Sequence, residues 1–393
     1  MKNKMNKWTL LLAGTGILTF PSVSSAEEAT SPVMTSLSST MLSGYVDTSA
    51  QWNLGSGNAG LPAYSFGQGK ADGFNLNAVK LSIENLPSEG DWIASYKVDL
   101  LFGPDARSLS TSSSGFDESD FAIKQAFMAL HAPFGNGLEL KFGVWDTIIG
   151  YESFDSPANP HHTRSYGYTI EPTTHTGLLA TYKFSDALSV SAGVANTFGP
   201  DINSRAFPEK AESYKTWMAS VALTAPKNLG FLAGSSLYAG IINGFNPSTP
   251  DGSSGGFVAG DQTSYYIGTT MNTPIRALKL GAAYDYLGID DQPLRGSTYA
   301  NAVAVYGSLA LSEKLTLLAR GEYASSGSAI LLGADDVVAV TATLQYDLWR
   351  NVLSRIEFRW DHATDGSEPY GGTDTAGGKD DSLILLANIA YRF

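Results

Sequence analysis

The sequence predicts an all-β chain whose roughly sixteen strands close into an up-and-down antiparallel barrel that spans a membrane. Three observations carry this prediction. Apolar side chains recur at every second position of many segments, and short connections alternate with long ones along the chain. After the first twenty residues, no apolar run approaches the roughly 18 residues that a membrane-spanning helix needs.

The segment 382–393 (SLILLANIAYRF) shows the period-two pattern most clearly. Its alternate positions from Leu383 to Phe393 are apolar, whereas the positions between them include Ser382, Asn388 and Arg392. A strand with one apolar and one polar face is expected from this pattern. Because the segment is long and ends on an aromatic residue, we expect it to be the lipid-facing strand that closes the barrel.

The first residues have the features of a secretory signal peptide. Three lysines (Lys2, Lys4 and Lys7) precede a short apolar run, and small residues follow at 24–26. The apolar run is too short to cross roughly 30 Å of hydrocarbon. The expected organisation is therefore a signal peptide at 1–26, a linker at 27–40 and a transmembrane barrel at 41–393.

The composition restricts the function of the chain. The formal net charge is −13, and removal of a signal peptide with three lysines and no acidic residue would lower it to −16. This acidity argues against nucleic acid as a partner. The chain has no cysteine, which excludes disulfides and thiolate metal sites. Plentiful glycine and aromatic residues with few charges are typical of a transmembrane barrel.

Sixteen strands are expected in chain order. They are 42–53, 73–85, 91–103, 120–132, 137–146, 175–184, 187–198, 214–225, 235–246, 262–273, 276–287, 299–311, 314–324, 337–347, 351–362 and 382–393. Short connections alternate with long ones at 54–72, 104–119, 147–174, 199–213, 246–261, 288–298, 324–336 and 363–381. This alternation predicts short periplasmic turns and long extracellular loops.

The two faces of several strands differ in polarity. In 351–362, for example, Ile356 and Phe358 alternate with Arg355, Glu357 and Arg359. A wall of alternating charge is compatible with a water-filled lumen and not with an apolar core. Tryptophan and tyrosine gather near expected strand ends, as in the aromatic belts of a membrane protein.

The connection 147–174 carries the densest chemistry in the chain. A connection of about 28 residues is usually functional or disordered, and its three prolines favour a defined path. We expect it to fold into the lumen, so that its carboxylates face basic residues of the inner wall and a transverse field filters solutes. The alternative is that these carboxylates decorate an outer loop while the wall charges pair among themselves.

The candidate constriction has a loop side and a wall side. On the loop side it comprises Glu152, Asp155, Arg164, Glu171 and His175. On the wall side it comprises Lys97, Asp99, Lys141, Lys183, Arg320, Glu322, Arg355, Glu357 and Arg359.

The same segment carries a resemblance to a known family. Residues 156–160 (SPANP), 164–166 (RSY), 171–172 (EP) and 174–177 (THTG) resemble the putative β-barrel porin type 2, OmpL-like family. The resemblance implies an outer-membrane pore with most of the mature chain in the barrel. It implies neither a solute nor any functional residue. General porins of this size are often trimers, so a homotrimer is an open expectation.

No cofactor or metal is expected. His161, His162 and His175 lie in apolar company without the spacing of a metal site. Acidic pairs at 117–118, 290–291, 335–336 and 380–381 all fall on long connections, where solvated loop charge is the simpler interpretation. The sharper hypothesis is an acidic outer rim that gathers divalent cations next to lipopolysaccharide phosphates.

The expected function is passive diffusion of small hydrophilic solutes or ions through a pore of the outer membrane, with no enzymatic activity. A plugged structural or adhesive barrel is the main alternative, because side chains and loops can fill a lumen. The other alternative is an outer-membrane barrel enzyme. Such an enzyme would need a serine or aspartate together with a histidine near the rim, and no such set is found on adjacent expected strands.

Overall fold

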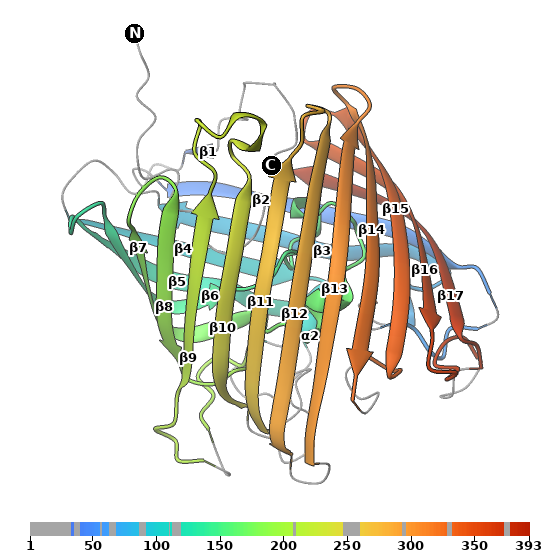
Figure 1. Ribbon diagram of the computed structural model, residues 1–393, viewed down its shortest axis with the longest axis horizontal. Helices are drawn as coiled ribbons and strands as arrows, with labels where there is room; N and C mark the ends of the chain where they lie inside the picture. The colour runs from blue at the N-terminus through green and yellow to red at the C-terminus, as the bar shows by residue number, and fades with distance from the viewer. Residues whose placement is uncertain are drawn as a thin grey trace.

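A computed structural model describes residues 33–34, 40–55, 57–62, 68–85, 92–109, 111, 119–206, 210–246, 260–292, 296–327, 332–372 and 378–393. In this part of the chain, sixteen antiparallel strands form one closed sheet (Figure 1). The expected signal peptide lies outside the described residues, as does nearly all of the expected linker.

The barrel strands follow the chain order. They are β2 (Thr40–Asn53), β3 (Gly73–Asn85), β4 (Ile93–Phe102), β5 (Phe121–Ala132), β6 (Leu138–Asp146), β7 (Thr174–Lys183), β8 (Leu188–Ala195), β9 (Thr216–Thr224), β10 (Ser236–Asn246), β11 (Gly260–Asn272), β12 (Leu278–Gln292), β13 (Gly296–Ala310), β14 (Leu315–Ser326), β15 (Asp336–Trp349), β16 (Val352–Ala363) and β17 (Asp381–Arg392). Each pairs with its sequence neighbour, and β17 pairs with β2 to close the barrel. A two-residue strand, β1 (Val33–Met34), adds to β2. The expectation of about sixteen strands is confirmed.

The connections sort by length between the two ends of the barrel. At the end where β2 starts and β17 finishes, tight turns join β5 to β6, β7 to β8, β11 to β12, β13 to β14 and β15 to β16. We call this the short-turn end, and it is uppermost in Figure 1. The opposite end, the long-loop end, carries connections such as 54–72, 103–120 and 196–215.

Two connections differ from the expected pattern. The long loop expected at 288–298 is mostly strand, because β12 and β13 each run for 15 residues and pair as far as Gln292 opposite Gly296. At the short-turn end, β9 and β10 are joined by 225–235, which is longer than its neighbours and contains the 3-10 turn η4 (Gly230–Leu232). The first difference arises because β12 and β13 remain paired beyond the membrane. The alternation of apolar and polar residues, from which the strand ends were predicted, stops where contact with lipid stops.

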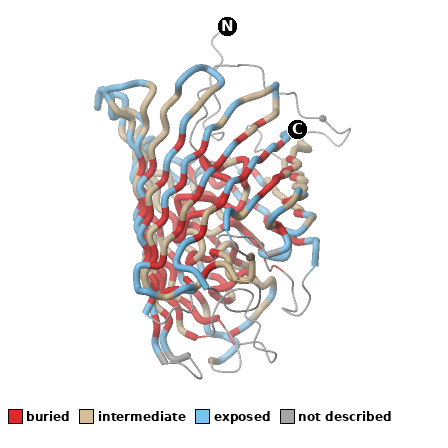
Figure 2. Tube along the Cα trace, turned by 90° about the vertical axis from the view of Figure 1, so that its right-hand side faces the viewer, coloured by how far each residue is buried: buried red, intermediate tan, exposed pale blue. Residues whose placement is uncertain are grey.

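The outer wall is apolar, as the period-two pattern predicts. Exposed and buried positions alternate along the strands (Figure 2). On β16, Ile356 and Phe358 are exposed while Arg355, Glu357 and Arg359 are buried inside. Large aromatic side chains are exposed near both strand ends, and they include Trp52, Trp92, Trp217, Trp349 and Tyr391. These positions fit two aromatic belts at the membrane surfaces.

The core of the molecule lies inside the barrel. Two short helices, α1 (Pro104–Leu109) and α2 (Tyr166–Ile170), contact the wall. Helix α1 packs on β3, β4 and β5, whereas α2 packs on β12, β13 and β14. Among the described residues, no helix has the length and apolar character to cross a bilayer.

Candidate functional site

Residues 147–173, which join β6 to β7, fold into the barrel, and we call them the inner loop. None of these residues is exposed. The inner loop contains the 3-10 turn η3 (Ser156–Ala158) and helix α2, whose first turn is capped by Ser165 accepting from the backbone N–H of Tyr168 at 3.1 Å. Its ends hydrogen-bond to each other through Thr147 and Thr173. The loop therefore has a closed base and an ordered path.

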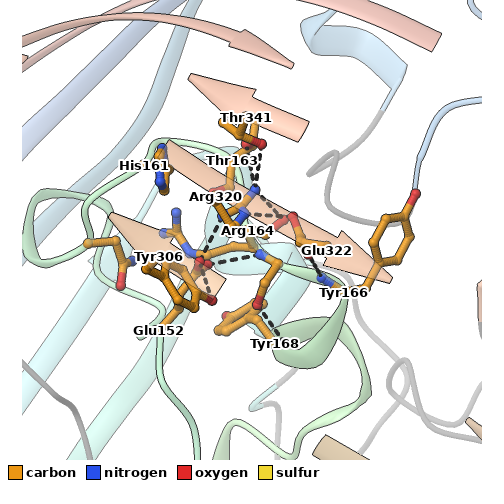
Figure 3. A network of polar contacts seen from close by, with 12 residues as sticks. Glu152, His161, Thr163, Arg164, Tyr166, Tyr168, Tyr306, Arg320, Glu322 and Thr341 are labelled. Carbon is orange, nitrogen blue, oxygen red and sulfur yellow. Dashed lines mark hydrogen bonds and ion pairs between the residues drawn. The ribbon is translucent and has the colours of Figure 1, made fainter. Parts of the chain in front are cut away.

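The first anchor of the inner loop is an ion pair with strand β14. The Arg320 guanidinium donates to the Glu152 carboxylate at 2.7 Å and to Glu322 at 2.6 Å (Figure 3). It also donates to the carbonyl oxygen of Thr163 at 3.0 Å. The Arg320, Glu152 and Glu322 side chains are essentially inaccessible to solvent. One guanidinium thus joins two carboxylates and the loop backbone, which suits its planar fork of donors.

Wall carboxylates bind the backbone N–H groups of the loop. Glu357 accepts from the N–H of His162 at 2.6 Å and of Thr163 at 2.9 Å. Glu322 accepts from the N–H of Tyr166 at 2.7 Å. These contacts satisfy buried donors that helix and sheet pairing leave unpaired.

Wall arginines bind the loop carbonyl groups in the same way. Arg355 donates to the carbonyl oxygen of Asn159 at 3.0 Å, and Arg359 donates to that of Arg164 at 2.5 Å. Arg359 is also paired with Asp361 at 2.8 Å. The alternating charges of β16 therefore bind the loop backbone, with acidic side chains on N–H groups and basic ones on carbonyls.

The second anchor lies on the other side of the lumen. Asp155 accepts from Lys80 of β3 at 2.7 Å and from the Tyr45 hydroxyl of β2 at 3.0 Å, and it lies 3.5 Å from Lys124 of β5. Burial alone would raise the pKa of Asp155, but the ammonium groups of Lys124 and Lys80 outweigh burial and hold the pKa well below its usual value. Asp155 is thus kept ionised.

The two anchors hold the inner loop across the barrel. Around the closed sheet, β14 lies four, five and seven of the sixteen strand-to-strand steps from β2, β3 and β5, which carry Tyr45, Lys80 and Lys124, and eight steps would be diametrically opposite. Glu152 and Asp155 are only three residues apart in the chain. The loop is therefore tied, within this short stretch, to two well-separated parts of the wall.

Apolar side chains of the loop fit against small residues of the wall. Tyr151 stacks on Tyr306 of β13, with ring centroids 4.1 Å apart. A Cβ at Gly281 would stand 1.9 Å from the Tyr151 hydroxyl, and one at Gly240 would stand 2.6 Å from a methyl of Ile149. Glycine is required at these two positions because the loop approaches the wall so closely.

The last predicted carboxylate of the loop, Glu171, lies against another acid. Its side chain is buried and hydrogen-bonds with Asp285 of β12. Burial, followed by the adjacent Asp285, raises the pKa of Glu171 well above its usual value. The expectation that Glu171 faces a basic residue of the wall is therefore wrong.

The loop histidines are structural. Nδ1 of His161 lies 2.7 Å from the Thr343 hydroxyl, and Nδ1 of His162 lies 3.2 Å from that of Ser156. Burial, reinforced by Arg320 and Arg355 respectively, lowers the pKa of both imidazoles well below the usual value, so both are neutral. His175, at the base of the loop on β7, lies 3.1 Å from the Thr147 hydroxyl.

The remaining predicted residues have other partners. Arg164 is buried within the loop, where it donates to the carbonyls of Ser153 at 2.9 Å and Phe154 at 2.8 Å. Three lysines expected to face the loop pair with wall or turn residues instead. Lys97 lies 3.3 Å from Glu84, Lys141 lies 3.3 Å from Glu139, and Lys183 lies 2.8 Å from Asp186. Asp99 on β4 lies 3.1 Å from Lys80.

Sequence reasoning missed Tyr45, Lys80 and Lys124. Asn77 of β3 and Lys124 of β5 are extra residues at register shifts against β2 and β4, so the period-two pattern reverses part-way along β3 and β5, which carry the two lysines. Tyr45 lies on β2, where the buried positions continue at every second residue through Asp47 and Ser49. A single lysine in the apolar run 121–130 was the available signal, because an isolated charge in such a run needs a buried partner.

A cavity of about 220 Å³ lies between the apex of the inner loop and the wall at the short-turn end. Residues 157–160 form one side of it. Inner-facing residues of β12 to β15, including Lys279, Ser308 and Gln345, form the other side. The lumen is thus hollow on the short-turn side of the loop.

One group of described residues has three side chains that could together hold a metal ion. It consists of His362, Asp380 and Asp381 at the long-loop end, where the site is largely exposed. Nδ1 of His362 lies 3.0 Å from Asp381, and the Trp360 indole donates to the same carboxylate at 2.7 Å. These residues lie outside the lumen wall and take no part in the constriction.

Comparison with known proteins gives a family and a fold. The family model described as "putative beta-barrel porin-2, OmpL-like" matches residues 39–393. No curated protein matches the chain in sequence.

Several solved porins have the same fold. An anion-selective porin from Comamonas acidovorans is 12% identical, with 90% of this chain and 99% of that chain covered and a TM-score of 0.61. The outer-membrane channel DcaP of Acinetobacter baumannii is 12% identical, with 90% and 97% covered and a TM-score of 0.58. OmpT of Vibrio cholerae in a trimer form is 15% identical, with 90% and 99% covered and a TM-score of 0.56.

Proposed function

We propose that the inner loop is the constriction of this chain, which belongs to the putative beta-barrel porin-2, OmpL-like family and is an outer-membrane channel, and that the chain has no enzymatic activity. Small hydrophilic solutes and ions diffuse passively past this loop. The barrel supplies a polar path through the hydrocarbon, and the loop decides what fits through it.

The observation that carries the proposal is the pair of anchors on two well-separated parts of the wall. Glu152 is bound to Arg320 at 2.7 Å, and Asp155 is bound to Lys80 at 2.7 Å. A segment tied at both sides cannot swing out of the lumen without breaking buried ion pairs, and each would cost several kcal/mol. The loop is therefore a fixed obstacle that sets the width of the passage.

The charges at the loop also determine the field that a solute crosses. The two anchor carboxylates of the loop face Arg320 on one wall and Lys80 with Lys124 on the other. Because each carboxylate is in direct contact with its cation, a solute passes beside these pairs and not between the opposed charges. Selection by size combined with weak selection by charge follows from this arrangement.

The second candidate function is a plugged structural barrel. It is favoured by one observation, namely that no residue of the inner loop is exposed. Membership of a porin family supports the open channel instead. A homotrimer is also proposed, because one of the OmpT structures with this fold is a trimer form.

Swelling of proteoliposomes in uncharged sugars of graded size tests the proposal. The intact protein should admit small sugars and exclude larger ones. A variant in which a short glycine linker replaces 150–171 should admit the larger sugars as well. Swelling with the shortened variant alone would identify a plugged barrel, and a size limit that is unchanged by the deletion would place the constriction elsewhere.

A further inference from the structure

Glu171 and Asp285 form an acid pair inside the barrel. The two carboxyl groups are within hydrogen-bond reach of each other, and both residues are buried. Two carboxyl groups can hydrogen-bond only when one of them carries a proton, because two carboxylates are both acceptors. A hydrogen bond between them therefore requires a shared proton.

The surroundings of the pair offer no compensating positive charge. The charged groups that act on Glu171 are Asp285 of β12 and Glu152 of the inner loop, and both are acidic. Tyr266, which pairs with Asp285 across β11 and β12, and Tyr168 of α2 also face the pair. Tyrosines cannot neutralise a carboxylate, so ionisation of both acids would leave unbalanced buried charge.

Two glycines let the carboxyl groups meet. A Cβ at Gly150 would stand 2.4 Å from Oε2 of Glu171, and a Cβ at Gly167 would stand 2.2 Å from Oδ2 of Asp285. Gly150 has φ of +117°, a conformation that side chains rarely adopt. The pair is thus enclosed by loop backbone on the limb that leads from α2 back to β7.

We propose that the Glu171–Asp285 pair is a proton-operated latch, which holds this limb of the inner loop on β12 when one proton is shared and releases it when the proton is lost to water. The latch rests on the proposed function, since it acts by changing the width of the constriction. Release of the limb leaves the Glu152 and Asp155 anchors in place, so the loop loosens on one side only.

The sign of the effect follows from linkage. Burial and then the proximity of Asp285 raise the pKa of Glu171 in the latched state, whereas a released, hydrated Glu171 would have an ordinary pKa near ~4.3. The latched state therefore binds the proton more tightly and is favoured at low pH. Between the ordinary and the raised pKa, the ratio of released to latched channels grows about tenfold per pH unit. The advantage of the latched state is thus lost as the pH rises through the raised pKa, above which the ratio is constant.

Single-channel conductance of the refolded full chain between pH 5 and pH 9, at constant salt, tests the latch. The wild-type conductance should rise reversibly with pH. Glu171→Gln keeps a hydrogen-bonding amide without a titrating group, so its conductance should stay at the low-pH value throughout. Asp285→Asn should show the same constant conductance, and it replaces Glu171→Gln in the experiment if that variant does not fold. Glu212→Gln, at an exposed loop position, should follow the wild type.

Two results would overturn the latch. One is a pH response that Glu171→Gln and Asp285→Asn both retain, and the other is a wild-type conductance that is flat from pH 5 to pH 9. A conductance at pH 9 that millimolar calcium returns to its low-pH value, in the wild type but not in Glu171→Gln, would assign the pair to cation binding instead. The swelling assay with sugars distinguishes failure of the latch from failure of the proposed function. It measures the size limit of the constriction at a single pH and therefore does not depend on the latch.

Discussion

Replacing Arg320 with methionine should release the first anchor of the inner loop. Methionine keeps most of the length of the side chain but has no donor. The substitution removes hydrogen bonds to Glu152 at 2.7 Å, to Glu322 at 2.6 Å and to the Thr163 carbonyl at 3.0 Å. Two carboxylates then remain buried without their shared cation.

The magnitude follows from the partners that remain. Removing one member of a buried ion pair costs about 3–5 kcal/mol. Glu152 keeps the N–H of Ser165 at 2.9 Å and the Tyr306 hydroxyl at 3.1 Å, so we take the lower end of this range. A loss of about 3 kcal/mol raises the population of the released loop about a hundredfold, because 1.36 kcal/mol corresponds to a factor of ten.

The assay uses the absence of cysteine from the chain. A single cysteine at Ser153, which is buried in the inner loop, reacts with a thiol reagent only when the loop opens. Its modification should be about a hundredfold faster in Arg320→Met. Lys97→Met is the matched control, since Lys97 pairs with Glu84 on the wall, and its rate should equal that of the parent. A less than threefold acceleration in Arg320→Met would refute the anchoring role of Arg320.

Two further predictions concern the second anchor and the lipid-facing wall. Asp155→Asn should accelerate the same cysteine reaction and enlarge the conductance, because Lys80 and Lys124 lose their shared carboxylate; an unchanged rate would contradict the second anchor. Ile356→Arg places a charge on a 59% exposed outer position and should lower the free energy of unfolding in vesicles by about 2–4 kcal/mol. Ser308→Arg, which faces the cavity, should cost less, and an equal cost at both positions would contradict the assignment of the two faces.

Most of the barrel could be predicted from the sequence because lipid contact imposes a strict period of two. The outer and inner faces of 351–362 follow from that period, and so does the number of strands. The extension of β12 and β13 could not be predicted in this way. Beyond the membrane the outward positions are no longer apolar, as at Asp290, although backbone pairing continues there.

The position of the inner loop could be predicted from the sequence, but the partners of its charged residues could not. Its length and prolines indicated an ordered path, and Arg320 was one of several candidate partners for Glu152. Lys80 and Lys124 were missed because register shifts reverse the two faces of their strands. The pairing of Glu171 with Asp285 contradicts simple charge complementarity. Such a contact depends on burial and a shared proton, which no local sequence pattern encodes.

Single-channel conductance in a planar bilayer, with and without residues 150–171, tests the central claim most directly. The account predicts stable steps from the intact protein and larger steps from the shortened one, since Arg320 and Lys80 hold the inner loop inside the lumen. Equal steps from the two proteins would contradict a constriction at the inner loop. Silence from the intact, folded barrel together with conduction by the shortened one would make the loop a plug.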